Sequence, residues 1–303
     1  MPQSSFMDLI AEQWADFGSM QFTVTIFFTF SLIEALTTTP RPPPKPPPEL
    51  VTDMFYWMLI PTVRVVSRIA SVLLLLLPAA LLGVEVGPTL LHGFGPVARQ
   101  PTWLIGLELL LLIDLSSYWT HRAFHTVPWL WRFHAIHHSA KRIRWATTGR
   151  VHPVNEMINY LVAVVPFFLV GFPVSVVLEL TPFITLWVIA AHTWNFTLGP
   201  LSGVLVSPRY HRWHHTHADE GGNKNFANLF ALWDRVFGTY YLPEDRVAER
   251  FGLDRDDVTE SYLAQLAYPF RRHPVPAIPI EPAPEPAPDA ALSRVSSAPS
   301  QVR

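Results

Sequence analysis

The chain contains no cysteine among its 303 residues. This absence excludes a disulfide framework, a thiolate zinc site and a cysteine-held iron–sulfur cluster. Any metal that this protein binds must therefore be held by nitrogen or oxygen ligands.

Charged residues are also scarce, at 15% of the sequence, whereas about a quarter is usual in soluble domains. Hydrophobic residues make up 50%, and the formal net charge is only −2. No basic excess or reading module for nucleic acid is present, so the composition excludes that partner and favours a membrane protein. Only three of the 22 basic residues are lysines. This usage is typical of GC-rich bacterial genomes, so the bacterial inner membrane is the expected location.

The hydrophobic residues gather in five runs, at 21–36, 69–84, 103–119, 157–170 and 174–191. Some runs are shorter than the roughly 20 residues that a membrane-crossing helix needs. The sequence therefore predicts an all-α integral membrane bundle of about four to five spans. The polyproline stretch 40–48 ends the first run, because proline cannot continue a helix. Residues 171–173 are expected to form a hairpin turn between the last two spans.

Composition also divides the chain into four parts. Residues 1–50 are expected to hold the first span and a polyproline linker, and residues 51–241 a membrane domain with the metal site. Residues 242–273 are more charged and are expected to form cytoplasmic surface helices, one of them over 258–270. From 274 to 303 the chain is rich in proline, alanine and serine, which predicts a disordered tail.

Basic residues indicate the orientation of the bundle. One basic group lies between the first two runs and a larger one follows the third: Arg41, Lys45, Arg64 and Arg68, then Arg122, Arg132, Lys141, Arg142, Arg144 and Arg150. Cytoplasmic segments of membrane proteins carry an excess of lysine and arginine. Both segments are therefore expected in the cytoplasm, with the amino terminus outside and every histidine cluster on the cytoplasmic side.

Eight of the thirteen histidines lie in three clusters: His121 and His125; His134, His137 and His138; and His211, His214 and His215. Residues three or four apart share one face of a helix, so each cluster offers two or three imidazoles toward a common point. Imidazole is a good ligand for iron, zinc and copper. His192 closes the last apolar run and brings the candidate metal ligands to nine.

Nine candidate ligands are too many for one tetrahedral zinc ion, and the sequence has no His-Glu-x-x-His motif. Two metals that share the set are the simpler account. An isolated pair such as His121 and His125 is more often a hydrogen-bonded pair, so the repeated His-x-x-His-His pattern carries the prediction. Asp114 lies on the same helical stripe as this pair. It is expected to orient a ligand histidine, directly or through Tyr118.

These clusters, in this order and each after an apolar run, resemble the fatty acid hydroxylase or sterol desaturase superfamily. The resemblance extends over about residues 103–241 and includes two further segments: Arg150-Val-His152-Pro-Val-Asn-Glu156, and Asn225-Phe226 followed by Trp233-Asp234-Arg235-Val236-Phe237-Gly238-Thr239. Leu198-Gly-Pro-Leu201 with Pro208-Arg-Tyr-His211 is similar to the alkylglycerol monooxygenase and bacterial sterol-desaturase-like branch.

The chain departs from one part of this pattern. Fatty acid 2-hydroxylases carry a further His-x-x-x-His pair near the last span, whereas here His192 is followed four residues later by Phe196. The resemblance therefore implies one histidine fewer at the second metal, and Asn195, Glu156 or water is expected to complete it. His152 is carried over as a further candidate site residue.

The resemblance implies a four-helix membrane core capped by a cytoplasmic di-metal domain that oxidises a lipid with dioxygen and two iron ions. A lipid C–H bond is unreactive, so the reaction needs a redox metal. Zinc has no redox chemistry, although it can replace iron in a purified preparation. No dinucleotide or flavin motif is visible, so electrons are expected from a separate reductase with a ferredoxin or cytochrome. Hydroxylation is favoured over desaturation.

Two other classes of membrane protein fit this sequence less well. A metal transporter or storage protein places ionisable residues near the bilayer midplane, whereas these histidines collect at the ends of apolar runs. A b-haem electron carrier needs pairs of axial histidines and not triple clusters.

Overall fold

The computed structural model describes residues 20–37, 48–81, 83, 89, 91–255 and 257–271. Within these ranges the chain is helical and has no β-strand, only an isolated antiparallel bridge between Thr216 and Phe251. The α-helices are α2 (Met20–Thr37), α3 (Pro48–Leu81), α5 (Thr102–Thr126), α6 (Pro128–His138), α7 (Pro153–Val170), α8 (Val174–Thr193), α9 (Pro208–His214), α10 (Leu232–Val236) and α11 (Tyr262–Ala267). Short 3-10 segments join them, at Val97–Arg99, Trp145–Gly149, Gly199–Gly203, Ala218–Glu220 and Tyr268–Phe270.

Four of these helices, α3, α5, α7 and α8, are long and apolar enough to cross a membrane. A helix satisfies its own backbone donors and acceptors, which lipid cannot do, so long apolar runs fold this way. The predicted all-α bundle with about four spans is confirmed. The run at 21–36 forms α2, whose apolar part, Val24–Leu36, is shorter than the other four.

Helix α3 differs from the sequence prediction. We expected a polyproline linker within residues 1–50 and the second span only over 69–84, but a single helix of 34 residues begins at Pro48. At 1.5 Å per residue it is about 51 Å long, which exceeds the roughly 30 Å hydrocarbon core. The part of α3 before residue 69 carries Asp53, Arg64 and Arg68, and these charged side chains hid that part of the helix from a search for uncharged runs.

The apolar core lies at one end of the four long helices. Leu75 from α3, Leu109 from α5, Phe168 from α7 and Val176 from α8 are among its buried members. The predicted hairpin turn at residues 171–173 is confirmed between α7 and α8, where Gly171 adopts a φ of 103° that favours glycine. The backbone N–H of Phe94 donates to the Gly171 carbonyl at 2.9 Å, which ties the segment before α5 to this turn.

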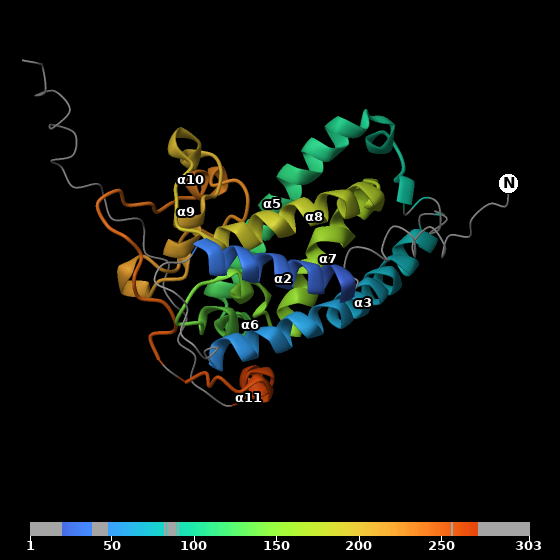
Figure 1. Cartoon of the computed structure of the whole chain (residues 1–303). Coiled ribbons are helices and arrows are strands. Elements are labelled where there is room, and N and C mark those ends of the chain that lie inside the picture. Colours follow the sequence, from blue (N-terminus) through green and yellow to red (C-terminus); the bar gives the residue numbers. More distant parts are fainter. Residues whose placement is uncertain are drawn as a thin grey trace, which may run out of the picture.

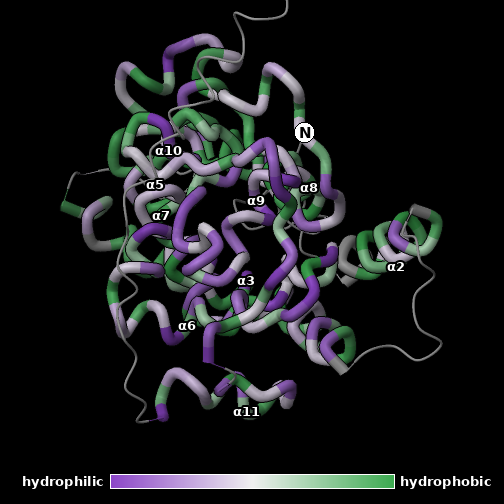
Figure 2. Tube along the Cα trace, turned by 90° about the vertical axis from the view of Figure 1, so that its left-hand side faces the viewer, coloured by the Kyte–Doolittle hydropathy of each residue, from purple (hydrophilic) through white to green (hydrophobic). Residues whose placement is uncertain are grey.

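The shorter helices gather at the opposite end of the long ones. Figure 1 shows α6, α9 and α10 toward this end, where the last turns of α5 and α8 also lie. Figure 2 looks onto the same end and shows hydrophilic chain segments in the middle of the bundle. Polar side chains such as His138, His211 and His214 are buried at this end, which is unusual unless their polar atoms are satisfied.

The segment that follows the cap returns to the first half of α3. We expected a surface helix over 258–270, and the structure has α11 followed by a 3-10 turn, Tyr268–Phe270. Tyr262 of α11 packs edge-to-face on Tyr56 of α3, with ring centroids 5.0 Å apart. This segment therefore packs against the first half of α3 and holds it in place. The tail predicted over 274–303 and the polyproline residues 40–47 lie outside the described residues.

Candidate metal centre

Four helices carry the nine candidate ligands to one end of the bundle. His121 and His125 lie on the last turns of α5, and His192 lies on the last turn of α8. Pro128 starts α6 directly after α5 and turns the chain, so that the second cluster faces the first. The third cluster lies on α9 and at its carboxyl end. All nine rings are buried except that of His121, which is partly buried.

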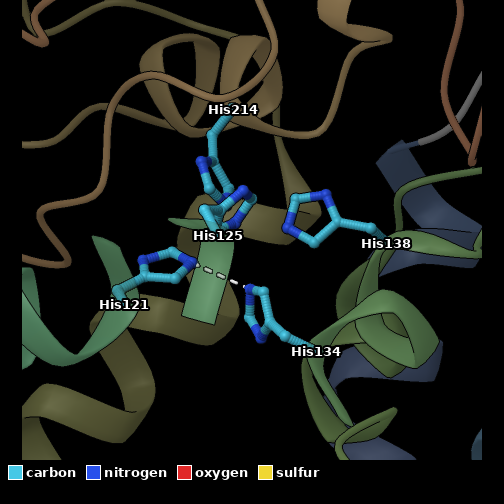
Figure 3. Close-up of side chains that lie close together, drawn as sticks. All are labelled: His121, His125, His134, His138 and His214. Atoms are coloured by element: carbon cyan, nitrogen blue, oxygen red, sulfur yellow. Dashed lines mark hydrogen bonds between the residues drawn. The ribbon is translucent and has the colours of Figure 1, made fainter. Parts of the chain in front are cut away.

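The nine rings form two groups, and within each group the ligand atoms lie within 4.8 Å of one another. The first group, drawn in Figure 3, is His121, His125, His134, His138 and His214. The second group is His137, His192, His211 and His215. Adjacent residues on a helix point about 100° apart. For this reason the neighbours His137 and His138 serve different groups, as do His214 and His215.

The outward-facing nitrogen of six rings is held by an oxygen that only accepts hydrogen bonds. Nδ1 of four rings contacts a backbone carbonyl: His121 with Phe226 at 2.8 Å, His214 with Lys224 at 2.7 Å, His192 with Val188 at 2.8 Å and His137 with Arg150 at 3.3 Å. Nδ1 of two more contacts an amide oxygen: His125 with Asn223 at 3.1 Å and His134 with Asn155 at 2.9 Å. In these rings Nδ1 therefore carries the hydrogen, and Nε2 presents a lone pair to the centre of its group.

These inward-facing lone pairs fit a metal cation. In the first group Nε2 of His121 lies 3.0 Å from Nε2 of His134 (Figure 3), and in the second Nε2 of His192 lies 3.0 Å from that of His211. Nε2 of His125, His138 and His214 is buried without a hydrogen-bond partner. Lone pairs that face one another repel, and unpartnered buried nitrogens are costly, so a cation in each group would satisfy both. Nitrogen-only ligand sets of this kind suit iron, zinc or copper.

Electrostatics keep the rings in the form that binds metal. Burial lowers the pKa of the six histidines that lie outside the membrane-spanning helices: His134, His137, His138, His211, His214 and His215. Their mutual repulsion when charged lowers these pKa values further. All six are therefore neutral at neutral pH, as metal coordination requires.

A loop after the third cluster supplies several of the anchoring oxygens, and the side chains of Asn225 and Asp234 hold its shape. The Asn225 amide donates to the carbonyls of Tyr210 and Tyr241 at 3.0 and 2.7 Å, and its φ is 60°. The Asp234 carboxylate accepts from the backbone N–H groups of Phe226 and Ala227, both at 2.8 Å. These residues belong to the closing segment Asn225 to Thr239, so that segment works as a scaffold for the histidine anchors.

Asp114 acts on this loop and not on a histidine. We expected it to orient a ligand ring, directly or through Tyr118, but its carboxylate accepts from the backbone N–H groups of residues 228–230, two of them at 2.8 and 2.9 Å. Tyr118 contacts Thr239 at 2.9 Å and accepts from Arg122 at 3.0 Å. Both residues therefore reach the centre only through the loop that anchors His121. The helical spacing placed Asp114 on the face of the helix that carries His121 and His125, but it could not identify the loop as its hydrogen-bond partner.

The other three candidate site residues lie outside both groups. His152 caps α7, where its Nδ1 accepts from the Val154 N–H at 3.1 Å. Asn195 is exposed beyond the end of α8. Glu156 pairs with Arg64 at 3.5 Å, which leaves the second group with its four histidines. Neither side chain thus lies with the four histidines in this geometry, and a ligand role for either one stays a prediction.

Two residues that the sequence prediction missed, Asn155 and Asn223, touch the rings directly. Asn155 precedes Glu156 in the segment from Arg150 to Glu156, so a signal for it was present. Replacing Asn155 with alanine removes the acceptor for His134 Nδ1, and we expect metal affinity in the first group to fall about 10- to 100-fold. Competition with a chelator, followed by metal analysis, measures this change. Asn159→Ala is the matched control on the same helix, and an equal loss in both variants would contradict the role.

Two cavities reach the centre from different sides. The larger, about 310 Å³, lies between α3, α5, α7 and α8 and is lined at one end by His121, His134, His137, His192 and His211. Rings of both groups therefore face any molecule that occupies it. The smaller, about 190 Å³, reaches the remaining rings of the first group, His125, His138 and His214, past His217 and Asp254.

Residues 106–239 match the profile of a protein family described as "Fatty acid hydroxylase". This stretch contains all nine histidines of the two groups. The chain carries a domain of the fatty acid hydroxylase family. The resemblance inferred from the three clusters is confirmed, and the family match begins in α5 and ends at Thr239 of the loop scaffold.

Curated relatives of this fatty acid hydroxylase domain include lipid-oxidising enzymes. The ornithine lipid hydroxylase of Rhizobium tropici is 34% identical over 166 residues, which is 54% of this chain and 49% of the relative. The alkylglycerol monooxygenase of Danio rerio is 33% identical over 147 residues, 48% of this chain and 32% of the relative. Human lathosterol oxidase is 27% identical over 141 residues, 45% of each chain. The match thus spans about half the length of these relatives or less, and no solved structure is significantly similar.

Proposed function

We propose that this protein is an integral membrane oxygenase that uses two iron ions and dioxygen to hydroxylate a lipid. The proposal depends mainly on one observation: imidazole rings from both histidine groups line the end of a cavity that lies between apolar membrane helices. A lipid chain can enter such a cavity without leaving apolar surroundings. The names of the relatives, an ornithine lipid hydroxylase and an alkylglycerol monooxygenase among them, support a lipid substrate.

In this proposal the two histidine groups hold one iron ion each. When bound, the iron ions would supply the redox chemistry that an unreactive C–H bond requires. The chain itself fixes six of the nine rings through Nδ1 anchors and confines the lipid beside rings of both groups. The smaller cavity leads past the side chains of His217 and Asp254 to the first group, and it gives protons a route separate from the lipid.

We place the metal centre on the cytoplasmic side of a bacterial inner membrane, with electrons from a separate reductase and ferredoxin or cytochrome. The basic residues between His121 and Arg150 support that orientation. Lys141 and Arg142 are exposed beside the centre. They offer a positive surface to an acidic electron donor. Coupling to such a donor should weaken as salt is raised.

The test is to express the protein with iron in a bacterium that lacks a related gene and to compare lipid extracts by mass spectrometry. The wild type should produce a lipid that carries one additional oxygen atom, and His192→Ala should not. A lipid that has instead lost two hydrogen atoms would assign desaturation to the same centre. Iron-loaded wild-type protein with a competent donor and neither product would contradict the proposed function.

A further inference from the structure

A strip of polar side chains runs along the larger cavity, inside helices that are otherwise apolar. Arg64 and Arg68 of α3 line it on one side. Glu156, Asn159 and Tyr160 of α7 line it on the other. Residues three or four positions apart share a helix face, so each set forms one stripe directed at the same space. Arginine is expensive within a membrane span, and a functional role is the default hypothesis for it there.

The strip begins beside the metal centre. Glu156 follows Asn155, whose side chain holds the His134 ring at 2.9 Å, and Nε of Arg64 lies 3.5 Å from a Glu156 oxygen. Arg68 is one helical turn, about 6 Å, further from this end of α3. A polar group bound along the strip would therefore place the carbon atoms next to it near the histidine rings. The remaining chain would lie along the deeper apolar wall, which includes Ile113, Ala163 and Leu178.

The charged side chains that line the larger cavity favour an anionic ligand. Among the described lining residues two side chains, Arg64 and Arg68, are cationic, whereas Glu156 alone is anionic. Both arginines can donate several hydrogen bonds in a fixed, planar arrangement that matches carboxylate or phosphate oxygens. A cationic or uncharged group would gain less from the same wall.

We propose that Arg64 and Arg68 bind an anionic oxygen group, a carboxylate or a phosphate, at one end of an alkyl chain, and so select which carbon faces the metals. This inference deepens the proposed function and rests on it for the identity of the reaction. The ion pair with Glu156 belongs to this binding site, because the Glu156 carboxylate competes with the bound anionic group for Arg64. The two arginines are specificity residues here, and the histidines remain the ligands.

Binding of simple amphiphiles tests the assignment without any turnover. The protein is placed in phosphatidylcholine nanodiscs, and the binding of palmitate, hexadecyl phosphate and hexadecanol is measured by native mass spectrometry. We expect the wild type to bind at least one of the two anions about tenfold more tightly than hexadecanol, and Arg68→Gln to lose that difference. The anion that binds better identifies the group as carboxylate or phosphate. Arg68→Lys keeps the charge and should retain most of the preference.

Glu156→Gln provides the opposite change. It removes the competing carboxylate from Arg64, so binding of the preferred anion should become tighter while hexadecanol binding stays the same. A structural ion pair alone predicts no such gain. The assignment is overturned if Arg68→Gln weakens the anions and hexadecanol equally, or if Glu156→Gln weakens anion binding. Because these assays need neither iron nor dioxygen, a preserved anion preference in a protein that oxidises no lipid would refute only the proposed reaction.

Discussion

Replacing His211 with alanine is expected to lower the metal content of the iron-loaded protein from about two ions per chain to about one. Nε2 of His211 lies 3.0 Å from that of His192 and 3.1 Å from that of His215, so this ring is central to the second group. The first group takes its rings from α5, α6 and α9 and keeps all five of them. Product formation should fall by at least about 100-fold, because changing even an outer contact of a metal ligand has effects up to that size.

Metal analysis by mass spectrometry and lipid product analysis measure the two effects in one preparation. His92→Ala is the matched control, because this histidine is exposed and lies outside both groups. That variant should keep both ions. If His211→Ala retained two ions, or lost both with its fold intact, the division into two separate groups would be wrong.

Replacing Arg150 with methionine is expected to destabilise the protein by about 3 to 5 kcal/mol. The Arg150 side chain is fully buried and pairs with the equally buried Asp53 at 2.5 Å. It also donates to the Glu49 carbonyl at 3.0 Å and to Glu260 at 3.4 Å. Burial opposes its charge, yet the Asp53 carboxylate raises the pKa of Arg150 above the usual value. Without the guanidinium, the Asp53 carboxylate remains buried and unpaired, which is the source of the cost.

Thermal unfolding in nanodiscs measures this change, and the midpoint should fall by roughly 10 °C. The double variant Asp53→Leu with Arg150→Met should recover part of the loss, because it removes both charges from the interior. The exposed pair of Arg250 and Asp219 is the control, and Arg250→Ala should have little effect. A midpoint for Arg150→Met equal to that of Arg250→Ala would show that the buried pair contributes nothing to stability.

The sequence predicted the histidine ligands of the site much better than the residues that hydrogen-bond to their rings and hold them. Spacing alone brought His134, His137 and His138 to one side of a helix, because three- and four-residue intervals have local consequences. The anchor of His134 is Asn155, on another helix, and the anchor of His121 is a carbonyl 105 residues away. Such pairs depend on tertiary packing, and helical spacing describes only residues that are close together in sequence.

The limits of α3 show a second gap between pattern and fold. A hydropathy search finds its deep half and stops where Arg64 and Arg68 appear, because it treats each charge as a break. In the structure, Arg64 pairs with Glu156 of α7 and Asp53 pairs with Arg150, so the charges are carried inside the bundle. The helix therefore continues where the pattern ends. Partners distant in sequence decide this, and they are known only once the helices are assembled.

The division of two His-His dipeptides between the groups has a mechanical consequence. His137 and His138 have ring centroids 5.6 Å apart on α6, and those of His214 and His215 are 5.2 Å apart at the end of α9. Because the two histidines of each dipeptide are adjacent in one chain, covalent bonds and the helical geometry fix the distance between their rings. If α6 or α9 tilts when lipid arrives, both coordination spheres travel together. The separation between the two histidine groups would thus change little with motion in the cap, which the proposed pair of metal ions would need.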